Sequence, residues 1–258
     1  MGKILFLGII QGLTEFLPVS SSGHLLFSSL LIFKEPFNLP FVVSAHIGTL
    51  VAILIYFRRT IRAMICSLIR FHDVRYASER STIWHLIIAT VPAIVAGLGF
   101  GSRLEGFSSM RLLGLFWVLN GIILCLGEIR SITVQPGTMN AGRAFIIGCF
   151  QAIAILPGLS RSGMTIISAR NLGISEDGSF SFSFLLGIIA IAGGLIFELH
   201  AEPGSFSWNC VGVAAVSFVA GYGALHLFAK MLCQHRIKFF GFYTIVIGCL
   251  AILLGRNQ

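Results

Sequence analysis

Charged residues are scarce in this chain. Asp, Glu, Lys and Arg make up 11% of its 258 residues, whereas 56% of the residues are hydrophobic. A soluble domain carries roughly 25% charged residues, so the composition excludes a soluble globular fold for the chain as a whole. The mean hydropathy of +0.91 agrees and indicates that the lipid bilayer is the solvent of most of the surface.

Cysteine motifs are also missing, and the first apolar run is not typical of a leader. The six cysteines are scattered and none has CxxC spacing, which argues against a disulfide framework or a cysteine-held metal and favours small apolar packing residues. The first apolar run, which follows Lys3, is interrupted by Gln11 and Glu15. We therefore expect no cleavable signal peptide.

Long apolar runs dominate the rest of the chain. Six of them have 17 to 21 residues: 41–57, 83–101, 112–128, 182–199, 209–229 and 239–255. Each is close to the ~20 residues that a helix needs to cross a bilayer. Two further apolar regions, 4–33 and 144–172, are interrupted by Pro, Gly and Ser, so we expect each to be a re-entrant helix hairpin. The prediction is an all-α integral membrane protein with six transmembrane helices and two such hairpins.

The two interrupted regions resemble each other. "GIIQGLTEFLPVSSSG" (8–23) and "GCFQAIAILPGLSRSG" (148–163) share five residues at a constant offset of 140: Gly8/Gly148, Gln11/Gln151, Ser20/Ser160, Ser22/Ser162 and Gly23/Gly163. We therefore predict two repeats within one membrane domain, 1–140 and 141–258, each a hairpin followed by three spans. A re-entrant hairpin returns to the face where it began, whereas three spans end on the opposite face. The second repeat would therefore be inverted relative to the first, as in transporters whose broken helices form the binding site.

The basic residues predict the orientation. Loops 58–82, 129–143, 173–181 and 230–238, with Arg170, hold twelve Lys and Arg residues, against five on the opposite face and both termini. The positive-inside rule places the richer face in the cytoplasm and both termini outside. The same asymmetry accounts for the net charge of +8, so no nucleic-acid partner is expected.

Polar chemistry is concentrated in the two interruptions. A charge near the centre of the bilayer costs about 2.5–3.5 kcal/mol, so Arg161 and Glu15 indicate a functional site or an ion pair that only locks the two hairpins together. The serines of "SSSG" and "SRSG" have two interpretations as well. They can cap helices, and hydroxyls at two helix N-termini beside a guanidinium can also bind a phosphate.

A histidine adds a candidate acid–base group. His24 follows Ser21 by three residues, so on a helix the two share a face, and a hydroxyl beside an imidazole, with Glu15 nearby, is an arrangement for nucleophilic or general-base catalysis. The spacing leaves open which of the three serines, or a water molecule, attacks. Further polar residues of the apolar segments are candidate cavity-lining groups: Gln11, His46 and Gln151.

"QGLTEFLPVSSSGH" (11–24) and "PGLSRSGMT" (157–165) resemble the two signature motifs of the undecaprenyl-diphosphate phosphatase family, the BacA/UppP bacitracin resistance proteins. "HIGTLVAILIYFRR" (46–59) and "FSFLLG" (182–187) fit the family too. The resemblance implies a multi-pass enzyme of the bacterial inner membrane, with an active site open to the outer face. Such enzymes hydrolyse the C55 isoprenyl diphosphate to its monophosphate, which recycles the carrier lipid of peptidoglycan synthesis.

The resemblance also implies roles for residues. Glu15, Ser21, His24 and Arg161 would be catalytic, and a divalent cation, Mg²⁺ or Ca²⁺, would assist, held in part by Glu15. Together with the phosphate interpretation of the serines, it implies a phosphate-binding set: Ser20, Ser22, Ser160, Arg161, Ser162, Gly163 and Thr165. Gln11 and Ser181 stand where the family usually has acidic residues, which weakens the metal site. A translocator that moves a phosphorylated isoprenyl lipid without hydrolysis is the alternative function, and a homodimer is one oligomeric state that the sequence leaves open.

Overall fold

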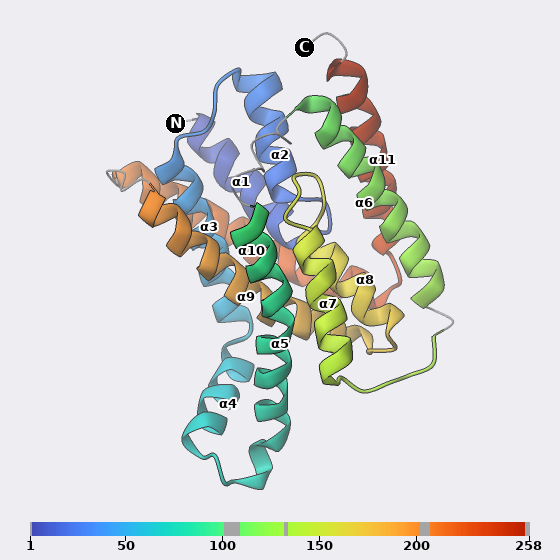
Figure 1. The fold of residues 1–258 in the computed structure, drawn as a ribbon. Coiled ribbons are helices and arrows are strands. Elements are labelled where there is room, and N and C mark those ends of the chain that lie inside the picture. Colours follow the sequence, from blue (N-terminus) through green and yellow to red (C-terminus); the bar gives the residue numbers. More distant parts are fainter. Residues whose placement is uncertain (1, 101–108, 132–133, 202–206, 256–258) are drawn as a thin grey trace.

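The computed structural model describes residues 2–100, 109–131, 134–201 and 207–255. Within these ranges the chain is helical and contains no strand (Figure 1). The α-helices are α1 (Gly2–Phe16), α2 (Ser21–Ser28), α3 (Leu39–Tyr56), α4 (Arg58–Ile69), α5 (Ala77–Phe100), α6 (Met110–Ser131), α7 (Ala141–Ile153), α8 (Arg161–Asn171), α9 (Glu176–Ala201), α10 (Trp208–Cys233) and α11 (Ile237–Leu254). A π-helical turn, Ser29–Phe33, continues α2, and a 3₁₀ turn, Val74–Tyr76, precedes α5.

Six of the described helices are long and apolar enough to cross a membrane: α3, α5, α6, α9, α10 and α11. Each of the six predicted spans falls on one of them. Their length follows from composition, because a helix rising 1.5 Å per residue needs about 20 apolar residues to cross the hydrocarbon core. The prediction of an all-α, multi-pass membrane protein is confirmed.

Both interrupted regions form two short helices around a turn. The first helix pair is α1 and α2, separated by residues 17–20, and the second is α7 and α8, separated by residues 154–160. Pro18 lies in the first gap, and Gly158, whose φ is 103°, lies in the second. A positive φ is readily accessible to glycine because it lacks a Cβ. The positions of the breaks are as predicted, and their re-entrant course through the bilayer stays a prediction.

Glycines allow the long helices to approach closely. A Cβ on Gly114 of α6 would meet the Gly248 carbonyl of α11, and a Cβ on Gly121 would meet the Gly241 carbonyl. Small residues at such contacts let backbones pack within a membrane, where there is no hydrophobic force between helices. Similar side-by-side packing joins α10 to α1 and α3, and α5 to α7, while α8 packs against α6, α7 and α9.

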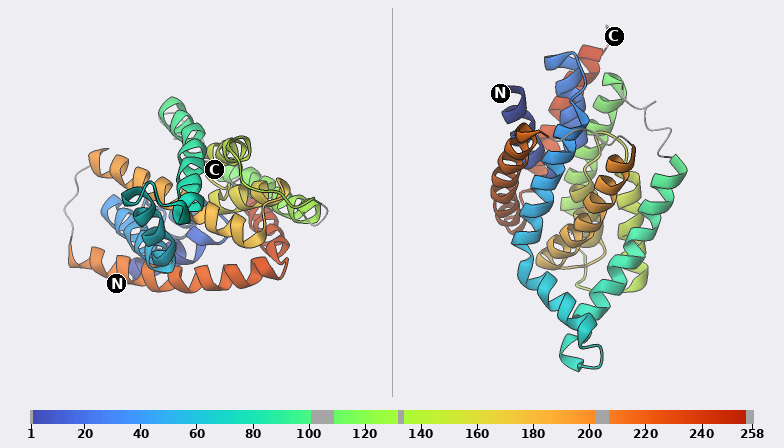
Figure 2. Two further views of the ribbon diagram at one scale, coloured as in Figure 1. Left: turned by 90° about the horizontal axis from the view of Figure 1, so that it is seen from below. Right: turned by 90° about the vertical axis from the view of Figure 1, so that its left-hand side faces the viewer.

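The two termini lie at the same end of the helix bundle, and α4 with its connection to α5 lies at the opposite end (Figures 1 and 2). Helix α4 brings Arg58, Arg59 and Arg62 to that opposite end. The distribution of these groups matches the predicted arrangement of one basic face and one face that carries both termini. Which face is cytoplasmic stays a prediction. The basic residues Arg103 and Arg256 fall outside the described residues.

Candidate active site

The two breaks contact each other inside the bundle. The Gly158 amide in the second break donates to Ser20 Oγ in the first, at 3.1 Å. Ser162 Oγ at the start of α8 donates to the Leu17 carbonyl at 3.4 Å. Two segments that are 140 residues apart in the sequence therefore form one joint between four short helices.

Helix α6 supports this joint with two polar side chains. Trp117 Nε1 donates to the Val19 carbonyl at 3.0 Å. Asn120 donates through Nδ2 to the Pro18 carbonyl at 3.1 Å and accepts the Ser160 amide at 2.9 Å. Irregular backbone survives at membrane depth only where the protein satisfies its polar groups, and these bonds meet that requirement.

Both breaks end in the same helix cap. Ser20 Oγ accepts the Gly23 amide at 3.3 Å, and Ser160 Oγ accepts the Gly163 amide at 3.2 Å. Each serine occupies the N-cap position, where its oxygen bonds one of the free amides of the first turn. The first helical residues are then Ser21 in α2 and Arg161 in α8.

Glu15, in the last turn of α1, joins these two first residues. Arg161 Nη2 donates to Glu15 Oε1 at 2.8 Å, and Ser21 Oγ donates to Glu15 Oε2 at 2.6 Å. Gln11 Nε2, one turn earlier, also donates to Oε2, at 2.9 Å. The side chains of Glu15 and Arg161 are only 9% and 15% exposed, so this is a largely buried charge pair. The predicted ion pair between the breaks is present.

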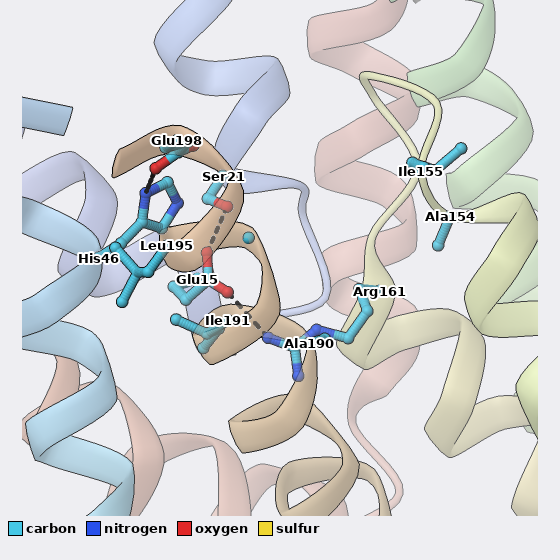
Figure 3. Close-up of a pocket in the computed structure, with 11 residues that line it drawn as sticks. Glu15, Ser21, His46, Ala154, Ile155, Arg161, Ala190, Ile191, Leu195 and Glu198 are labelled. Atoms are coloured by element: carbon cyan, nitrogen blue, oxygen red, sulfur yellow. Dashed lines mark hydrogen bonds and ion pairs between the residues drawn. The ribbon is translucent and has the colours of Figure 1, made fainter. Parts of the chain in front are cut away.

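A cavity of about 310 Å³ opens beside the Glu15–Arg161 pair. Its polar wall consists of Glu15, Ser21, His46, Arg161 and Glu198. In Figure 3, Glu15 lies between Arg161 on one side and the His46–Glu198 pair on the other, with Ser21 above it. The other wall is apolar and comes from the second break and α9: Ala154, Ile155, Ala190, Ile191 and Leu195. A cavity with a few convergent polar groups and an apolar wall is typical of a ligand site.

The guanidinium of Arg161 is only partly hydrogen-bonded by the described residues. Its Nη1 is buried and has no hydrogen-bond partner among the described residues. Gly187 of α9 provides the space for this guanidinium, because a Cβ there would collide with Arg161 Nη1. An unpaired buried donor is unfavourable by about 1–3 kcal/mol, and an anion that reached Nη1 would satisfy it. The alternative of a purely structural ion pair does not account for the unpaired donor.

His24 does not join Ser21 in the cavity. Its Nδ1 lies 2.8 Å from the Ser20 carbonyl and its Nε2 lies 2.8 Å from the Tyr243 hydroxyl. The ring is edge-on to Trp117 and stacked on Tyr243, with centroids 5.0 Å and 5.7 Å apart. The predicted Ser21–His24 pair is therefore not formed in this structure. Ser21 turns toward α1, whereas His24 turns toward α6 and α11.

The hydroxyls of the second motif are also directed away from the cavity. Ser160 caps α8, and Ser162 bonds Ser160 and the Leu17 carbonyl. Thr165 bonds the Arg161 carbonyl and Ser183. All three are buried and none lines the cavity; their phosphate contacts stay a prediction. Of the two roles considered for these serines, helix capping is the one that Ser160 has in this structure.

The remaining members of the predicted phosphate-binding set have packing or surface positions. Ser20 is buried at the joint, whereas Ser22 is exposed and its hydroxyl lies 3.3 Å from that of Ser20. Gly163 is buried, and a Cβ there would press on Leu124 and Pro18. Of the whole set, only Arg161 lines the cavity.

The two positions where an acidic residue was expected, Gln11 and Ser181, lie on different helices, α1 and α9. Gln11 is fully buried against Glu15, with its Oε1 unpaired among the described residues. Ser181 lines a different cavity, of about 210 Å³, together with Asp177 and Tyr56. Gln151, the repeat counterpart of Gln11, is buried and its Oε1 likewise has no described partner, but it does not line the site.

His46 lines the cavity as predicted, and a carboxylate that sequence reasoning missed lies beside it. Glu198 Oε2, near the end of α9, is 3.9 Å from His46 Nδ1. The signal for Glu198 was present in the sequence, because it is an acidic residue within the apolar run 182–199. Ionisable residues inside membrane segments usually mark a function.

A protein-held divalent cation does not fit these donors. Both oxygens of Glu15 already accept hydrogen bonds, one of them from the positively charged Arg161. Glu198, the other carboxylate of the cavity, faces His46. Among the described residues no group of three His, Cys, Asp or Glu side chains could hold a metal ion. Mg²⁺ binds through oxygen ligands, and the Arg161 guanidinium competes with it for the Glu15 carboxylate.

Comparison with known proteins gives the family of this chain. Residues 4–250 match the family described as bacitracin resistance protein BacA. Proteins named undecaprenyl-diphosphatase are similar over nearly their full length: 35% identity in Rhodopirellula baltica (98% of this chain, 97% of the relative), 37% in Hahella chejuensis (95% and 95%) and 34% in Methanococcus maripaludis (96% and 98%). With a match over almost the whole sequence and relatives above 30% identity, the chain belongs to the BacA family.

Proposed function

We propose that this chain hydrolyses undecaprenyl diphosphate to undecaprenyl phosphate and inorganic phosphate, which recycles the carrier lipid of cell-wall synthesis. Its relatives are named for this reaction. The observation that carries the proposal is one cavity that combines a serine hydroxyl bonded to a carboxylate with an arginine that has a free buried donor.

The arrangement supports phosphoryl transfer. Arg161 Nη1 can bind an oxygen of the terminal phosphate, because guanidinium groups form strong charge-assisted bonds to phosphate. Ser21 and Arg161, the first residues of α2 and α8, both bond Glu15, so the dipoles of these two helix N-termini favour an anion beside it. Catalysis of this reaction depends mainly on positioning and on stabilising the charge of the transition state.

Ser21 is the candidate nucleophile. Its Oγ donates to Glu15 Oε2 at 2.6 Å, so the carboxylate is placed to take the proton when the oxygen attacks phosphorus. A water molecule bound in the same place could use the same base. Arg161 and Gln11 hold Glu15 in position from the other sides.

The apolar wall suits an isoprenyl chain. Ala190, Ile191 and Leu195 form one side of the cavity along α9, and many side chains of the bundle surface are large and apolar. The lipid tail can therefore stay in the bilayer while the diphosphate reaches Glu15 and Arg161. Each chain contains the complete cavity, so the proposed reaction does not require a homodimer.

We further propose an orientation in the bacterial inner membrane with both termini and the cavity mouth on the outer face. Glu15 lies at the inner end of α1, while Glu198 lies near the end of α9 on the side of the termini. The inverted repeat remains part of the proposal. It is supported by matching contacts, since α1 packs on α10 as its counterpart α7 packs on α5, and α6 packs on α11.

The test uses the purified full chain in lipid nanodiscs with undecaprenyl diphosphate. Phosphate release and formation of the monophosphate by mass spectrometry are expected with the wild-type protein and not with Arg161→Ala. Arg59→Ala is the control, because Arg59 is exposed on α4. Movement of a labelled isoprenyl diphosphate across vesicles without phosphate release would instead support the translocator.

A further inference from the structure

We propose that His46, oriented by Glu198, is the acid–base residue of this cavity and protonates the isoprenyl phosphate as it leaves. The inference rests on the proposed function and assigns a residue that the motifs do not single out for catalysis. Breaking the diphosphate bond leaves an electron pair on the bridging oxygen. A positioned acid that delivers a proton there typically accelerates such a step about 10²–10⁴-fold.

His24 is not available for this role in the structure. Both of its ring nitrogens are engaged, one by the Ser20 carbonyl and the other by the Tyr243 hydroxyl. The ring is buried between Trp117 and Tyr243 and does not line the cavity. His24 instead ties α2 to α11.

His46 has the properties that His24 lacks. It lines the cavity together with Ser21, Glu15 and Arg161, and its side chain is 23% exposed. Its Nδ1 has no hydrogen-bond partner among the described residues. The nearest ionic group is Glu198 Oε2 at 3.9 Å, and Figure 3 shows this pair at one end of the cavity, across Glu15 from Arg161.

Glu198 explains how the ring would be oriented. A carboxylate facing Nδ1 favours the tautomer with a proton on Nδ1 and leaves Nε2 to exchange a proton with substrate. The gap of 3.9 Å is too long for a hydrogen bond, and catalytic hydrogen bonds often shorten only when substrate binds. Glu198 Oε2 also lacks a hydrogen-bond partner among the residues described, so closing this gap would satisfy two buried polar atoms together.

The proton balance closes over two half-reactions. Ser21 Oγ attacks the terminal phosphorus and its proton passes to Glu15, while the bond to the bridging oxygen breaks and that oxygen takes a proton from His46. Water then attacks the phosphorus of the phosphoserine and its proton goes to His46, while the bond between Ser21 Oγ and phosphorus breaks, inorganic phosphate leaves and Ser21 Oγ regains its proton from Glu15. One water molecule is consumed and both bases return to their starting state.

Other charged groups near His46 define the expected pH response. Glu198 faces it from α9, and Glu15 and Arg161 share the cavity from α1 and α8. Helix α10 brings Cys210 to Ser44, two residues before His46. Because a proton donor must be protonated to act, kcat should fall as the pH rises.

The experiment measures kcat and KM for undecaprenyl diphosphate against pH in wild type, His46→Gln and Glu198→Gln. We expect His46→Gln to lower kcat by about 100-fold, to change KM little and to abolish the fall at high pH. Glu198→Gln should lower kcat less and shift the pH limb. The double variant should be no slower than His46→Gln, because Glu198 acts through the ring. His226→Gln, an exposed histidine on α10, is the control.

A wild-type kcat and pH profile in His46→Gln, with Arg161→Ala inactive, overturns this inference and leaves the proposed function standing. If the wild type itself releases no phosphate, the proposed function fails first. Thermal unfolding in detergent separates either result from misfolding. Should His46→Gln not fold, an unchanged pH profile in Glu198→Gln also refutes the proposal.

Discussion

The two breaks have the same local structure but contribute different chemistry. Ser20 and Ser160 cap their helices through the glycine three residues later. The next residue, at the same offset of 140, is Ser21 in one helix and Arg161 in the other, and both side chains bond Glu15. One capped turn, used twice, can therefore supply a nucleophile and an anion-binding group to a single cavity.

The breaks also differ in strain. Ser20 has φ 69°, in the left-handed region, whereas Ser160 has φ −89°. A non-glycine residue in that region costs on the order of 1–3 kcal/mol and persists when the surroundings impose it. The Gly158 amide, bonded to Ser20 Oγ, is one such constraint. The strained break carries the proposed nucleophile, and the relaxed one carries the guanidinium.

The largest expected effect is the loss of Arg161. Arg161→Ala should lower kcat/KM for undecaprenyl diphosphate by about 10³-fold, because the charge-stabilising donor is removed. Arg161→Lys should recover only part of it, since an ammonium group cannot bind Glu15 and phosphate with the same planar geometry. Phosphate release measures both. Full activity of Arg161→Lys would show that charge alone suffices.

The next comparison is between neighbouring serines. Ser21→Ala should lower kcat by about 10²-fold if Oγ attacks phosphorus, whereas Ser22→Ala should leave kcat unchanged because Ser22 is exposed and outside the cavity. Phosphate release and trapping of a phosphorylated serine are the measurements. A fully active Ser21→Ala protein would assign the attack to water.

A smaller effect is expected at Gly187. Gly187→Ala should displace the Arg161 guanidinium, because the added methyl occupies its place, and should lower kcat/KM by about tenfold or more, a loss typical of a misplaced catalytic group. Gly193→Ala, on the same helix with open space around it, is the matched control. Equal activities of the two variants would mean that Arg161 has another position available.

The smallest expected effect concerns Ser160, the N-cap of α8. Ser160→Ala should lower the stability by about 1 kcal/mol, the usual loss for an N-cap serine, with kcat little changed because the hydroxyl does not line the cavity. The unfolding midpoint in detergent and phosphate release test the two parts. A large fall in kcat without loss of stability would restore Ser160 to the phosphate-binding set.

The sequence predicted the framework well because hydrophobicity determines it. The six spans and both breaks follow from apolar run length and from the interrupting Pro, Gly and Ser residues. The Glu15–Arg161 pair could also be foreseen, because each charge was isolated in an apolar region and needed a partner. The N-caps followed from the known preference for serine.

The direction of side chains around α2 could not be foreseen. Helical spacing puts Ser21 and His24 on one face. In the structure, however, Ser21 is hydrogen-bonded to Glu15 and His24 to Tyr243. These partners come from α1 and α11, and their relative positions depend on tertiary packing. The pairing of Glu198 with His46 could not be foreseen for a related reason, because nothing local in the sequence connects the end of α9 with α3.

Accessibility of positions 21 and 24 tests the central claim most directly. Ser21→Cys and His24→Cys proteins would be treated with a maleimide in nanodiscs, with and without a non-hydrolysable isoprenyl diphosphonate, and the modified residue identified by peptide mass spectrometry. The cavity geometry predicts that Cys at 21 is labelled, that the diphosphonate protects it, and that Arg161→Ala removes this protection. Protection at position 24 with an unreactive or unprotected position 21 would contradict the proposed site.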